Sequence, residues 1–455
     1  MPVFNAEKYV GIALDSLLEQ SFKDMEIICV DDGSTDQSLK ILQQYQKKDV
    51  RITILQQENK FAGVARNLGM SVARGKYLSF LDADDYFRPD MLQRAYECAE
   101  EENADIVVFG GEMFSEDINN VDPYPALLRG ELLPPAIKNS FENKIKIENI
   151  MNFTIPVPWN KLFRREFILN QQLQFQNYKR ANDSYFVLMA LVLAQKIGIV
   201  HEKLICYRTG NANSLQGSRN EAPMQFADVY SDIQNKLMEL NLYEQVEKSF
   251  RKRCLSTCVY MLEALTNADA FEKLYLKLQS ELFARFNIIG SPMSDYYDRY
   301  AYNQYLYICS HTPMEYLMDK LKNKNKQKME ELNETIKKDN KILNLYERWL
   351  RLKDNNSGIY TFFQDNDFEK VAVYGMGSLG RSLCSELRSH NIDITYVIEQ
   401  NSDRKNKDFT FYSIQDELPE ADVIIITPIT FYEEIAEQLA KKVKCPLLSF
   451  DDIVP

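Results

Sequence analysis

The sequence predicts an α/β fold that is followed by a helical segment and by a second, smaller α/β unit. Three observations lead to this expectation. Short apolar runs alternate with amphipathic stretches over residues 1–109, as in a parallel sheet covered by helices. Residues 223–352 are rich in leucine and tyrosine and nearly free of glycine and proline, which favours helix. After residue 367, a strand pattern leads through a glycine-rich turn into another helix.

Length and composition are those of a globular protein with a substantial core. The chain has 455 residues, of which 45% are hydrophobic and 26% charged, and such a length suits roughly two to four domains. The formal net charge of −12 argues against nucleic-acid binding, which needs a basic face. The eight cysteines include no Cys-x-x-Cys pair and there are three histidines, so neither a disulfide framework nor a zinc site is expected.

No membrane-spanning segment is expected. The most apolar run, residues 186–194, is too short to cross a bilayer, and the N-terminus shows no signal-peptide pattern. The sequence therefore predicts a cytoplasmic protein, with peripheral contact to a membrane surface as the alternative.

The first third of the chain divides into strands and helices in turn. Asn5 is a good helix N-cap, and Glu7 would lie in the first turn of the helix that follows. Further strands are expected at 26–30, 52–55, 77–81 and 106–109, and further helices after Asp36, from Phe61 to Ala73 and from Pro89. This alternation predicts a parallel sheet.

Three carboxylates follow the strand expected at 77–81. Asp82, Asp84 and Asp85 are close in sequence, and their like charges repel unless something offsets the repulsion. A divalent cation with oxygen ligands would do so, and the carboxyl ends of parallel strands are where open α/β sheets bind ligands. The alternative is a turn that leads into a helix at Pro89, since Asp favours both.

Four motifs stand out in this part of the chain. They are Pro-Val-Phe-Asn-Ala-Glu-Lys-Tyr (2–9), Val-Asp-Asp-Gly-Ser-Thr-Asp (30–36), Ala-Arg-Asn-Leu-Gly (65–69) and Phe-Leu-Asp-Ala-Asp-Asp (80–85). In order and spacing they resemble the motifs of family 2 glycosyltransferases, and the resemblance covers about the first half of the chain. It implies the GT-A fold, a nucleotide-diphosphate sugar as donor, with a UDP-sugar favoured, and a Mg²⁺ or Mn²⁺ ion.

The resemblance also implies roles for individual residues. Asp31 or Asp32 would accept an N–H of the base, and Arg66 would pair with the nucleotide. Asp82 would hold the ribose or the water shell of the metal, and Asp84 would bind the metal directly. Turn and cap chemistry for Asp31 and Asp32, and a solvated helix face for Arg66, are the alternatives. The further nucleotide-sugar contacts that the resemblance implies are Pro2, Phe4, Glu7 and Ser34.

One departure from the family pattern concerns the start of the sequence. Family members carry an apolar strand immediately before the segment that matches 2–9, whereas only Met1 precedes it here. Without that strand, neighbouring strand edges and apolar surface would be exposed. We therefore expect either that the true start lies upstream, which we favour, or that the protein is impaired.

Residues 159–162, Trp-Asn-Lys-Leu, resemble a Trp-x-Lys-Leu segment that lies beside the acceptor site in this family. Trp159 could stack on a sugar face, and Lys161 could reach a hydroxyl or a phosphate. The alternative is a core tryptophan beside a solvated lysine.

The catalytic base is expected further along the chain. Asp183 is similar to the family residue that deprotonates the acceptor hydroxyl, and Asn182 stands where that family has a Glu. A helix cap or first-turn acid is the alternative for Asp183. Arg208, counted among the acceptor-side residues, could approach the diphosphate or form a surface ion pair.

The implied reaction is the transfer of one sugar to a glycan or lipid-linked acceptor, with inversion, in bacterial cell-surface polysaccharide synthesis. The chain has no Gln-x-x-Arg-Trp, the mark of processive polysaccharide synthases, which favours single transfer. A catalytically impaired, nucleotide-sugar-binding scaffold is a second hypothesis, motivated by the absent first strand and by Asn182.

The helical segment has an aromatic and basic stretch. Tyrosines crowd residues 296–307, and lysines occupy alternate positions from 320 to 328. Such a region could rest on an anionic membrane, but a tyrosine-rich helix interface with a solvated lysine run is preferred. Residues 329–352 could pair as a short coiled coil with imperfect heptads, which would make the protein an oligomer.

The last part of the chain carries a glycine-rich fingerprint. Gly375, Gly377 and Gly380 follow a strand expected at 371–374, and Glu399 ends the next strand, as in dinucleotide-binding folds. The unit resembles small Rossmann-like domains appended to bacterial glycosyltransferases. It could bind a dinucleotide or serve a structural or regulatory purpose, and an NAD-linked oxidoreductase is the third and weakest hypothesis for the whole protein.

The predicted organisation is thus a catalytic domain at 1–220, a helical segment at 221–360 and a small Rossmann-like domain at 361–455.

Overall fold

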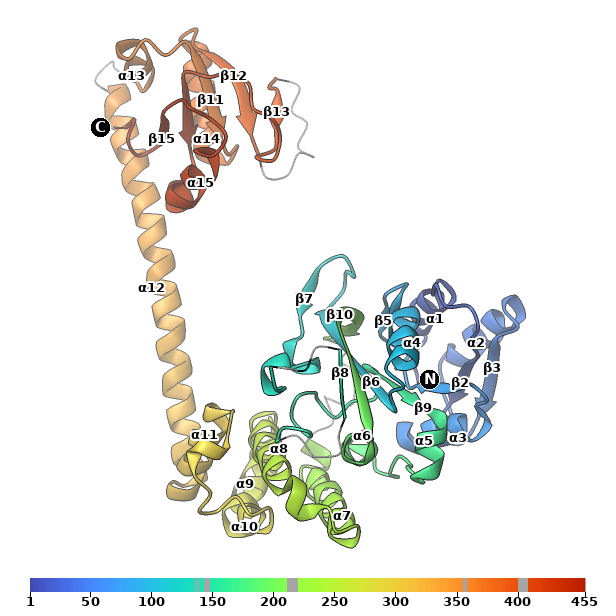
Figure 1. The fold of residues 1–455 in the computed structure, drawn as a ribbon. Coiled ribbons are helices and arrows are strands. Elements are labelled where there is room, and N and C mark those ends of the chain that lie inside the picture. The colour runs from blue at the N-terminus through green and yellow to red at the C-terminus, as the bar shows by residue number, and fades with distance from the viewer. Residues whose placement is uncertain are drawn as a thin grey trace. The chain divides into compact units, whose positions relative to one another are not determined.

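The computed structural model describes residues 1–455 apart from 136, 138, 143–147, 211–219, 355–357, 400–407 and 455. The chain forms two compact units, Met1–Leu317 and Met318–Pro455 (Figure 1). None of the helices in the described ranges has the length and apolar character that crossing a bilayer requires.

The first unit contains two sheets. In one, β1 (Pro2–Val3), β2 (Ile27–Asp31) and β3 (Ile52–Gln56) lie parallel in that order. The other has the order β4-β9-β6-β10-β5 and consists of β4 (Tyr77–Ser79), β9 (Lys161–Arg164), β6 (Ile106–Phe114), β10 (Lys196–Arg208) and β5 (Tyr86–Phe87). Short strands β7 (Val121–Pro123) and β8 (Ser140–Glu142) pair with β6 and β10.

The second of these sheets differs from the fully parallel sheet expected for this region. Strand β9 lies between β4 and β6 and runs antiparallel to both. Leu162 and Phe163 of β9 are both buried, although neighbouring side chains of a strand point to opposite faces. The strand therefore belongs to the interior of the sheet, and its position was not readable from the alternation of the first 109 residues.

The helices expected in the first third are present. They are α1 (Val10–Leu18), α2 (Ser38–Lys48), α3 (Phe61–Val72) and α4 (Met91–Glu101). Asn5, however, does not cap α1. It has a φ of 48°, and its Oδ1 accepts a hydrogen bond from Thr35 N at 2.8 Å. Asn5 thus joins the loop after β1 to the loop after β2, and α1 begins later, at Val10.

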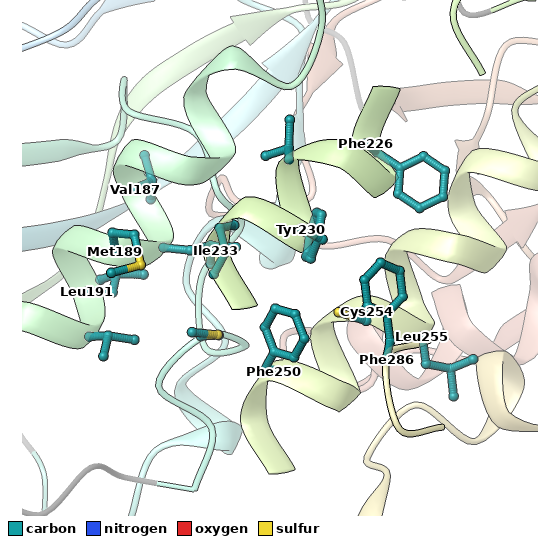
Figure 2. Close-up of a cluster of buried hydrophobic side chains, with 14 of the residues drawn as sticks. Val187, Met189, Leu191, Phe226, Tyr230, Ile233, Phe250, Cys254, Leu255 and Phe286 are labelled. Carbon is teal, nitrogen blue, oxygen red and sulfur yellow. The ribbon is translucent and has the colours of Figure 1, made fainter. Parts of the chain in front are cut away.

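A helical layer completes the first unit. It contains α5 (Arg165–Asn170), α6 (Asn182–Leu193), α7 (Gln225–Glu239), α8 (Tyr243–Glu263), α9 (Ala268–Lys277), α10 (Phe283–Arg285) and α11 (Arg299–Ser310). Figure 2 shows Val187, Ile233 and Phe250 from α6, α7 and α8 gathered in one buried cluster. The same cluster includes Leu78 and Ile106 of the second sheet. The helices beyond residue 220 therefore share a core with that sheet.

The tyrosine-rich stretch contributes to this core. Tyr296, Tyr302 and Tyr305 are buried within it, and Tyr302 donates a hydrogen bond to the carbonyl of Ser291 at 2.8 Å. These side chains form a helix interface, as the preferred sequence interpretation requires.

The second unit is an α/β domain with one parallel sheet. Its strands are β11 (Lys370–Tyr374), β12 (Asp393–Ile398), β13 (Phe411–Tyr412), β14 (Val423–Ile426) and β15 (Leu447–Ser449), in the order β13-β12-β11-β14-β15. Its helices include α13 (Tyr360–Asp365), α14 (Ser378–Ser389) and α15 (Tyr432–Leu439). Helix α12 (Pro313–Asp354) leads into this unit and contributes side chains to its core.

A cavity of about 680 Å³ lies between the two sheets of the first unit. Its walls include Ile27 and Ile28 of β2, Leu78 of β4 and Met70 of α3. The pairing of the N-terminal segment with β2 extends back to Ile28, whose carbonyl accepts from the Met1 amino group at 2.8 Å, and β4 is bonded to β9 on its other side. Two strand edges therefore face the cavity across mainly apolar walls, which is the setting in which an added strand binds.

We expect a strand supplied to this cavity to stabilise the first unit. Fusing a Val-Thr-Val-Ile segment in front of Met1 should raise the melting temperature by at least about 3 °C, because the segment would bond to both edges and bury apolar surface. Nucleotide-sugar affinity should rise with it. Differential scanning calorimetry and titration calorimetry measure the two effects. A Gly-Ser-Gly-Ser extension is the control, and equal values for the two fusions would contradict the expectation.

Candidate functional site

The acidic motif lies in the loop between β4 and β5, where burial alternates along the chain. Leu81 and Ala83 are buried in the core, whereas Asp82 and Asp84 are half-buried. Anchoring of the two apolar side chains leaves the two aspartates on the opposite side of the loop. Asp85, the third carboxylate of the motif, is 1% exposed and lies inside the protein. The loop therefore presents two of its three carboxylates.

Asp85 has a different environment from its neighbours. Its Oδ1 accepts a hydrogen bond from the backbone N–H of Arg208 at 2.9 Å, and its Oδ2 is buried without a partner among the described residues. Burial raises the pKa of the Asp85 carboxyl well above its usual range, and the negative charges of Asp84 and Asp82 raise it further. Asp85 thus joins the loop to the end of β10.

Arg208 holds the same loop from the other direction. Its Nε donates to the carbonyl of Asp84 at 2.9 Å, and its guanidinium lies over the rings of Tyr9 and Phe114, 4.7 and 4.3 Å from their centroids. The side chain is therefore neither in a surface ion pair nor extended toward solvent. It ties the acidic loop to the segment after β1 and to the end of β6.

Arg66 of α3 links the acidic loop to helix α6. Its Nη2 is 2.7 Å from Asp82 Oδ1, and its Nη1 donates to Asn182 Oδ1 at 3.1 Å. The residue is 7% exposed, so it is not the solvated helix residue of the alternative interpretation. A Cβ on Gly63 would lie 2.5 Å from the carbonyl oxygen of Gln176. Only glycine at this position lets α3 approach closely enough for Arg66 to reach Asn182.

Asp183 lies in the first turn of α6, next to Asn182. The helix begins after Ala181, whose φ of 53° is left-handed, and no side-chain cap is present. Burial raises the pKa of the Asp183 carboxyl, the nearby Arg66 cation opposes the shift, and the Asp82 charge adds to it. The structure thus brings Asp82, Arg66 and Asp183, predicted separately from distant motifs, into one electrostatic cluster.

The two aspartates at the end of β2 differ in their partners. Asp32 Oδ1 accepts hydrogen bonds from Gln57 Nε2 at 2.6 Å and from Lys60 N at 2.9 Å, so this side chain organises the loop after β3. Asp31 is 3% exposed, and its Oδ1 is buried without a partner in the described part of the chain. Asp31 therefore retains an acceptor atom, whereas Asp32 behaves as the turn alternative predicts.

The remaining residues expected at the nucleotide join two loops. Ser34 Oγ accepts from Asn5 N at 3.1 Å, and Glu7 Oε2 accepts from Gln37 N at 2.9 Å. Pro2 lies in β1, and Phe4 is 48% exposed. Glu7 and Ser34 therefore hold the loop after β1 against the loop after β2, and Phe4 is accessible.

Trp159 and Lys161 are not positioned to contact an acceptor directly. Trp159 is 4% exposed and stacks on Tyr207 with ring centroids 5.2 Å apart. Lys161 is fully buried, and burial, followed by the charge of Arg253, lowers the pKa of its ammonium group well below the usual value. Trp159 is thus the core tryptophan of the alternative interpretation, but Lys161 is an interior residue and not a solvated one.

The ammonium group of Lys161 is enclosed by oxygen atoms. Its Nζ lies 2.7–3.1 Å from Asn160 Oδ1, Val157 O, Ile155 O and Thr154 Oγ1. These acceptors all belong to the segment that precedes β9. Lys161 therefore holds the conformation of that segment from within.

Arg253 of α8 is a residue that sequence reasoning missed. Its Nε donates to Met151 O at 2.7 Å and its Nη2 to Thr154 O at 2.6 Å. It is 5% exposed and follows Phe250 by three positions, on the apolar side of the helix. A cation within an apolar stripe was the one available signal, but the carbonyls that it binds are about 100 residues away in the sequence.

The carboxylates of the acidic loop fit a divalent cation that takes most of its oxygen ligands from phosphate and water. No group of three or more His, Cys, Asp or Glu side chains suited to a metal occurs among the described residues. Asp82 and Asp84 are both half-buried in this loop, and Asp82 also pairs with Arg66. Mg²⁺ typically binds one or two carboxylates together with phosphates and water, so these residues fit an ion that a diphosphate brings.

The glycine-rich turn of the second unit is held by close backbone packing and by a hydrogen bond to Glu399. Gly375 has a φ of 89°, and a Cβ on Gly380 would lie 2.0 Å from the carbonyl oxygen of Gly375. These two positions therefore require glycine for the turn and for close packing of α14. Glu399 Oε1 accepts from Met376 N at 2.6 Å, so this carboxylate holds the turn.

Comparison with known proteins assigns the first part of the chain to a family. The family described as "Glycosyl transferase family 2" matches residues 1–169. The glycosyltransferase GlyG of Streptococcus pneumoniae is 32% identical over 212 residues, which cover 46% of this chain and 69% of GlyG. The chain belongs to the family 2 glycosyltransferases.

Other relatives and solved structures agree with this assignment. The uncharacterized glycosyltransferase EpsJ of Bacillus subtilis is 37% identical over 47% of this chain and 61% of its own length. The chain spans only 30% of GlyA from S. pneumoniae. The crystal structure of Staphylococcus aureus TarS 1–349 in complex with UDP-GlcNAc has a TM-score of 0.54 at 20% identity, covering 70% of this chain and 90% of that one. This likeness confirms the GT-A fold.

The second unit matches a different family. Residues 367–446 match the family described as "C2185-like, N-terminal". The parallel sheet expected here is confirmed, and a dinucleotide in this unit stays a prediction.

Replacing the buried lysine should destabilise the protein strongly. Lys161→Met should lower the free energy of unfolding by about 2–4 kcal/mol, because it leaves several buried oxygens without a donor. Urea denaturation followed by circular dichroism measures the change. Lys203→Met, at a side chain that is 52% exposed, is the control and should change the free energy by less than about 0.5 kcal/mol. Similar values for both variants would refute an interior role for Lys161.

Proposed function

We propose that this protein is an inverting, divalent-metal-dependent glycosyltransferase. It moves one sugar from a UDP-sugar to a hydroxyl of a glycan or lipid-linked acceptor of the bacterial cell surface. The observation that carries the proposal is the bridge made by Arg66, which joins Asp82 of the acidic loop to Asn182 of α6. Through this bridge, a carboxylate suited to proton abstraction lies beside a loop suited to a diphosphate and its cation.

Asp31 supports a nucleotide donor. Its buried Oδ1 has no partner among the described residues, and a buried acceptor without a partner is costly unless a ligand provides a donor. An N–H of uracil provides one. The fold likeness to a TarS structure in complex with UDP-GlcNAc, together with the curated TarS being a poly(ribitol-phosphate) β-N-acetylglucosaminyltransferase, favours UDP and a cell-surface polymer.

The acidic loop supports a cation. Asp84 would hold Mg²⁺ or Mn²⁺, which when bound offsets negative charge on the leaving diphosphate. Asp82, held in place by its ion pair with Arg66, would contact the water shell of the metal or the ribose. Arg208 fixes the backbone of the same loop by its bond to the Asp84 carbonyl.

Asp183 supports transfer with inversion. In a direct displacement, the acceptor hydroxyl gives its proton to Asp183 while its oxygen bonds to the anomeric carbon, and the nucleoside diphosphate leaves with the electron pair of the broken bond. One base is sufficient for this step. Asn182 accepts a hydrogen bond from Arg66 without adding a second negative charge beside Asp183.

The variant Asp183→Asn should lose catalysis while it keeps donor binding. We expect it to lower kcat by about 10²–10⁴, because the proton acceptor is lost. The Kd for the donor with Mn²⁺ should stay within about threefold of wild type, which calorimetry checks. Glu166→Gln, an exposed acid on α5, serves as a matched control and should leave kcat unchanged. Near-wild-type turnover by Asp183→Asn would remove Asp183 from the mechanism, and a wild type that binds the donor without any turnover would favour the nucleotide-sugar-binding scaffold.

The pH dependence of the reaction should reflect the environment of Asp183. A raised pKa means that the carboxyl becomes ionised, and therefore active as a base, only at a higher pH than a free aspartate of pKa about 3.9. The acid side of the kcat/KM profile should accordingly lie above that value. Because the Arg66 cation favours the ionised carboxylate, Arg66→Gln should move this side of the profile to still higher pH. A shift to lower pH would contradict the electrostatic cluster.

A further inference from the structure

The N-terminal half of helix α12 lies outside the core of the second unit. Leu345 and Trp349 are buried in that core, and Trp349 Nε1 donates to Glu386 Oε2 at 2.8 Å. Earlier in the helix, every residue of 321–341 is exposed. Helices in proteins gain most of their stability from the packing of an apolar face, so a surface that covers this part of α12 would stabilise it.

One side of this exposed stretch is apolar. At about 100° per residue, the four apolar side chains of residues 318–332 fall within about 40° of a common direction. They are between 52% and 60% exposed and are Met318, Leu321, Met329 and Leu332. Asn325 is the one polar side chain in the same arc. Single exposed hydrophobic residues need no explanation, but several on one side of a helix mark an interaction surface.

Lysines border this apolar arc on both sides. Lys322 and Lys328 lie about 60° from its centre in opposite directions, and Lys326 and Lys324 follow at about 100°. The side chains of Lys322 and Lys326 are 72% and 77% exposed. The far side of the helix carries mainly acid and amide side chains and comprises Asp319, Lys320, Asn323, Gln327, Glu330 and Glu331. The helix is therefore apolar on one side, cationic along both borders and mainly acidic opposite.

This order of side chains fits a membrane surface. A lysine at the border of an apolar face can lay its aliphatic stem along that face and extend its ammonium group to an anionic headgroup. The apolar side chains then reach the boundary between headgroups and acyl chains, and the acidic ones point to water. In a pair of identical helices the border lysines would repel one another. A nucleic-acid backbone would leave the four apolar side chains in water.

Charge complementarity selects an anionic membrane. The chain as a whole has a formal net charge of −12, so an anionic surface repels it in most orientations. Residues 320–328, in contrast, carry a lysine at every second position and no acid. A lysine close to an anionic surface strengthens binding about fivefold. The attraction is therefore local, and it turns this segment toward the membrane.

We propose that residues 318–332 of α12 bind an anionic membrane surface, with the apolar arc toward the lipid and the border lysines on the headgroups. This surface is separate from the site of sugar transfer, and the proposal depends on neither the donor nor Asp183.

Co-sedimentation of the full chain with lipid vesicles tests the proposal. The protein should bind vesicles of about 30% phosphatidylglycerol in phosphatidylcholine at least about tenfold more tightly than vesicles of phosphatidylcholine alone. Raising the salt to about 0.5 M should weaken this binding, because salt screens the lysines. Absence of binding, or equal binding to both compositions, would overturn the proposal. Binding to soluble polyglutamate but not to vesicles would also overturn it, in favour of an acidic protein partner.

Paired substitutions separate the border lysines from charge in general. Lys322→Gln with Lys328→Gln should weaken binding to the anionic vesicles at least about tenfold. Lys337→Gln with Lys338→Gln removes the same charge from the far side of the same helix and should weaken it less than about twofold, because these lysines lie farther from the headgroups. All four positions are exposed, so folding, followed by circular dichroism, should be unchanged. Equal losses in the two pairs would overturn the proposed orientation.

Tryptophan fluorescence tests which side of the helix meets the lipid. The native Trp159 and Trp349 are both buried, so their emission should change little when vesicles are added. Met329→Trp should give a blue shift with anionic vesicles, because indole settles at the boundary between headgroups and acyl chains. Gln327→Trp, on the far side, should give none. An equal response of the two variants, or a shift in Gln327→Trp alone, would overturn the proposal.

Discussion

The bridge made by Arg66 is the interaction on which the proposed site depends. One buried guanidinium joins the loop after β4 to the start of α6, segments that lie over 90 residues apart in the sequence. A buried cation is stable only when it is paired and hydrogen-bonded. The pairing with Asp82 and Asn182 therefore fixes two loops at once. It also sets the electrostatic balance at Asp183, where burial and the Asp82 charge act against the charge of Arg66.

Two further buried cations hold the segment at residues 151–157. Lys161 and Arg253 both donate hydrogen bonds to its carbonyl oxygens. This segment has little regular structure, and its backbone acceptors need donors from elsewhere. Two side chains from β9 and α8 supply these donors, and the loop beside Trp159 acquires a fixed shape that its own hydrogen bonds would not give it.

Local sequence patterns predicted much of the fold, whereas the parts that depend on long-range contacts could not be predicted. The strands that end at Asp31 and precede Asp82 followed from short apolar runs, and α1 followed from its apolar stripe. The antiparallel position of β9 was not predictable, because neighbours in a sheet are chosen by packing and not by local pattern. Asp31, Asp32 and Asp183 were identified from sequence motifs. The sequence could not show that these aspartates have different hydrogen-bond partners, that Lys161 is buried, or that Arg253 binds the segment before β9. Each of these contacts joins residues that are far apart in the chain, and a single sequence does not reveal which distant residues meet.

The core shared by the second sheet and the helices has a consequence for how the protein can be divided. Side chains of α7 and α8 gather in one buried cluster (Figure 2), which also includes Leu78 and Ile106, and Arg253 donates from α8 to the segment before β9. A fragment cut at residue 220 would lose the α7 and α8 side chains that pack in this cluster, and the apolar surface so exposed would favour aggregation. The compact unit that contains the candidate site is Met1–Leu317. Segments of the proposed acceptor side can therefore be exchanged between relatives only if the helices that follow β10 are exchanged together with them.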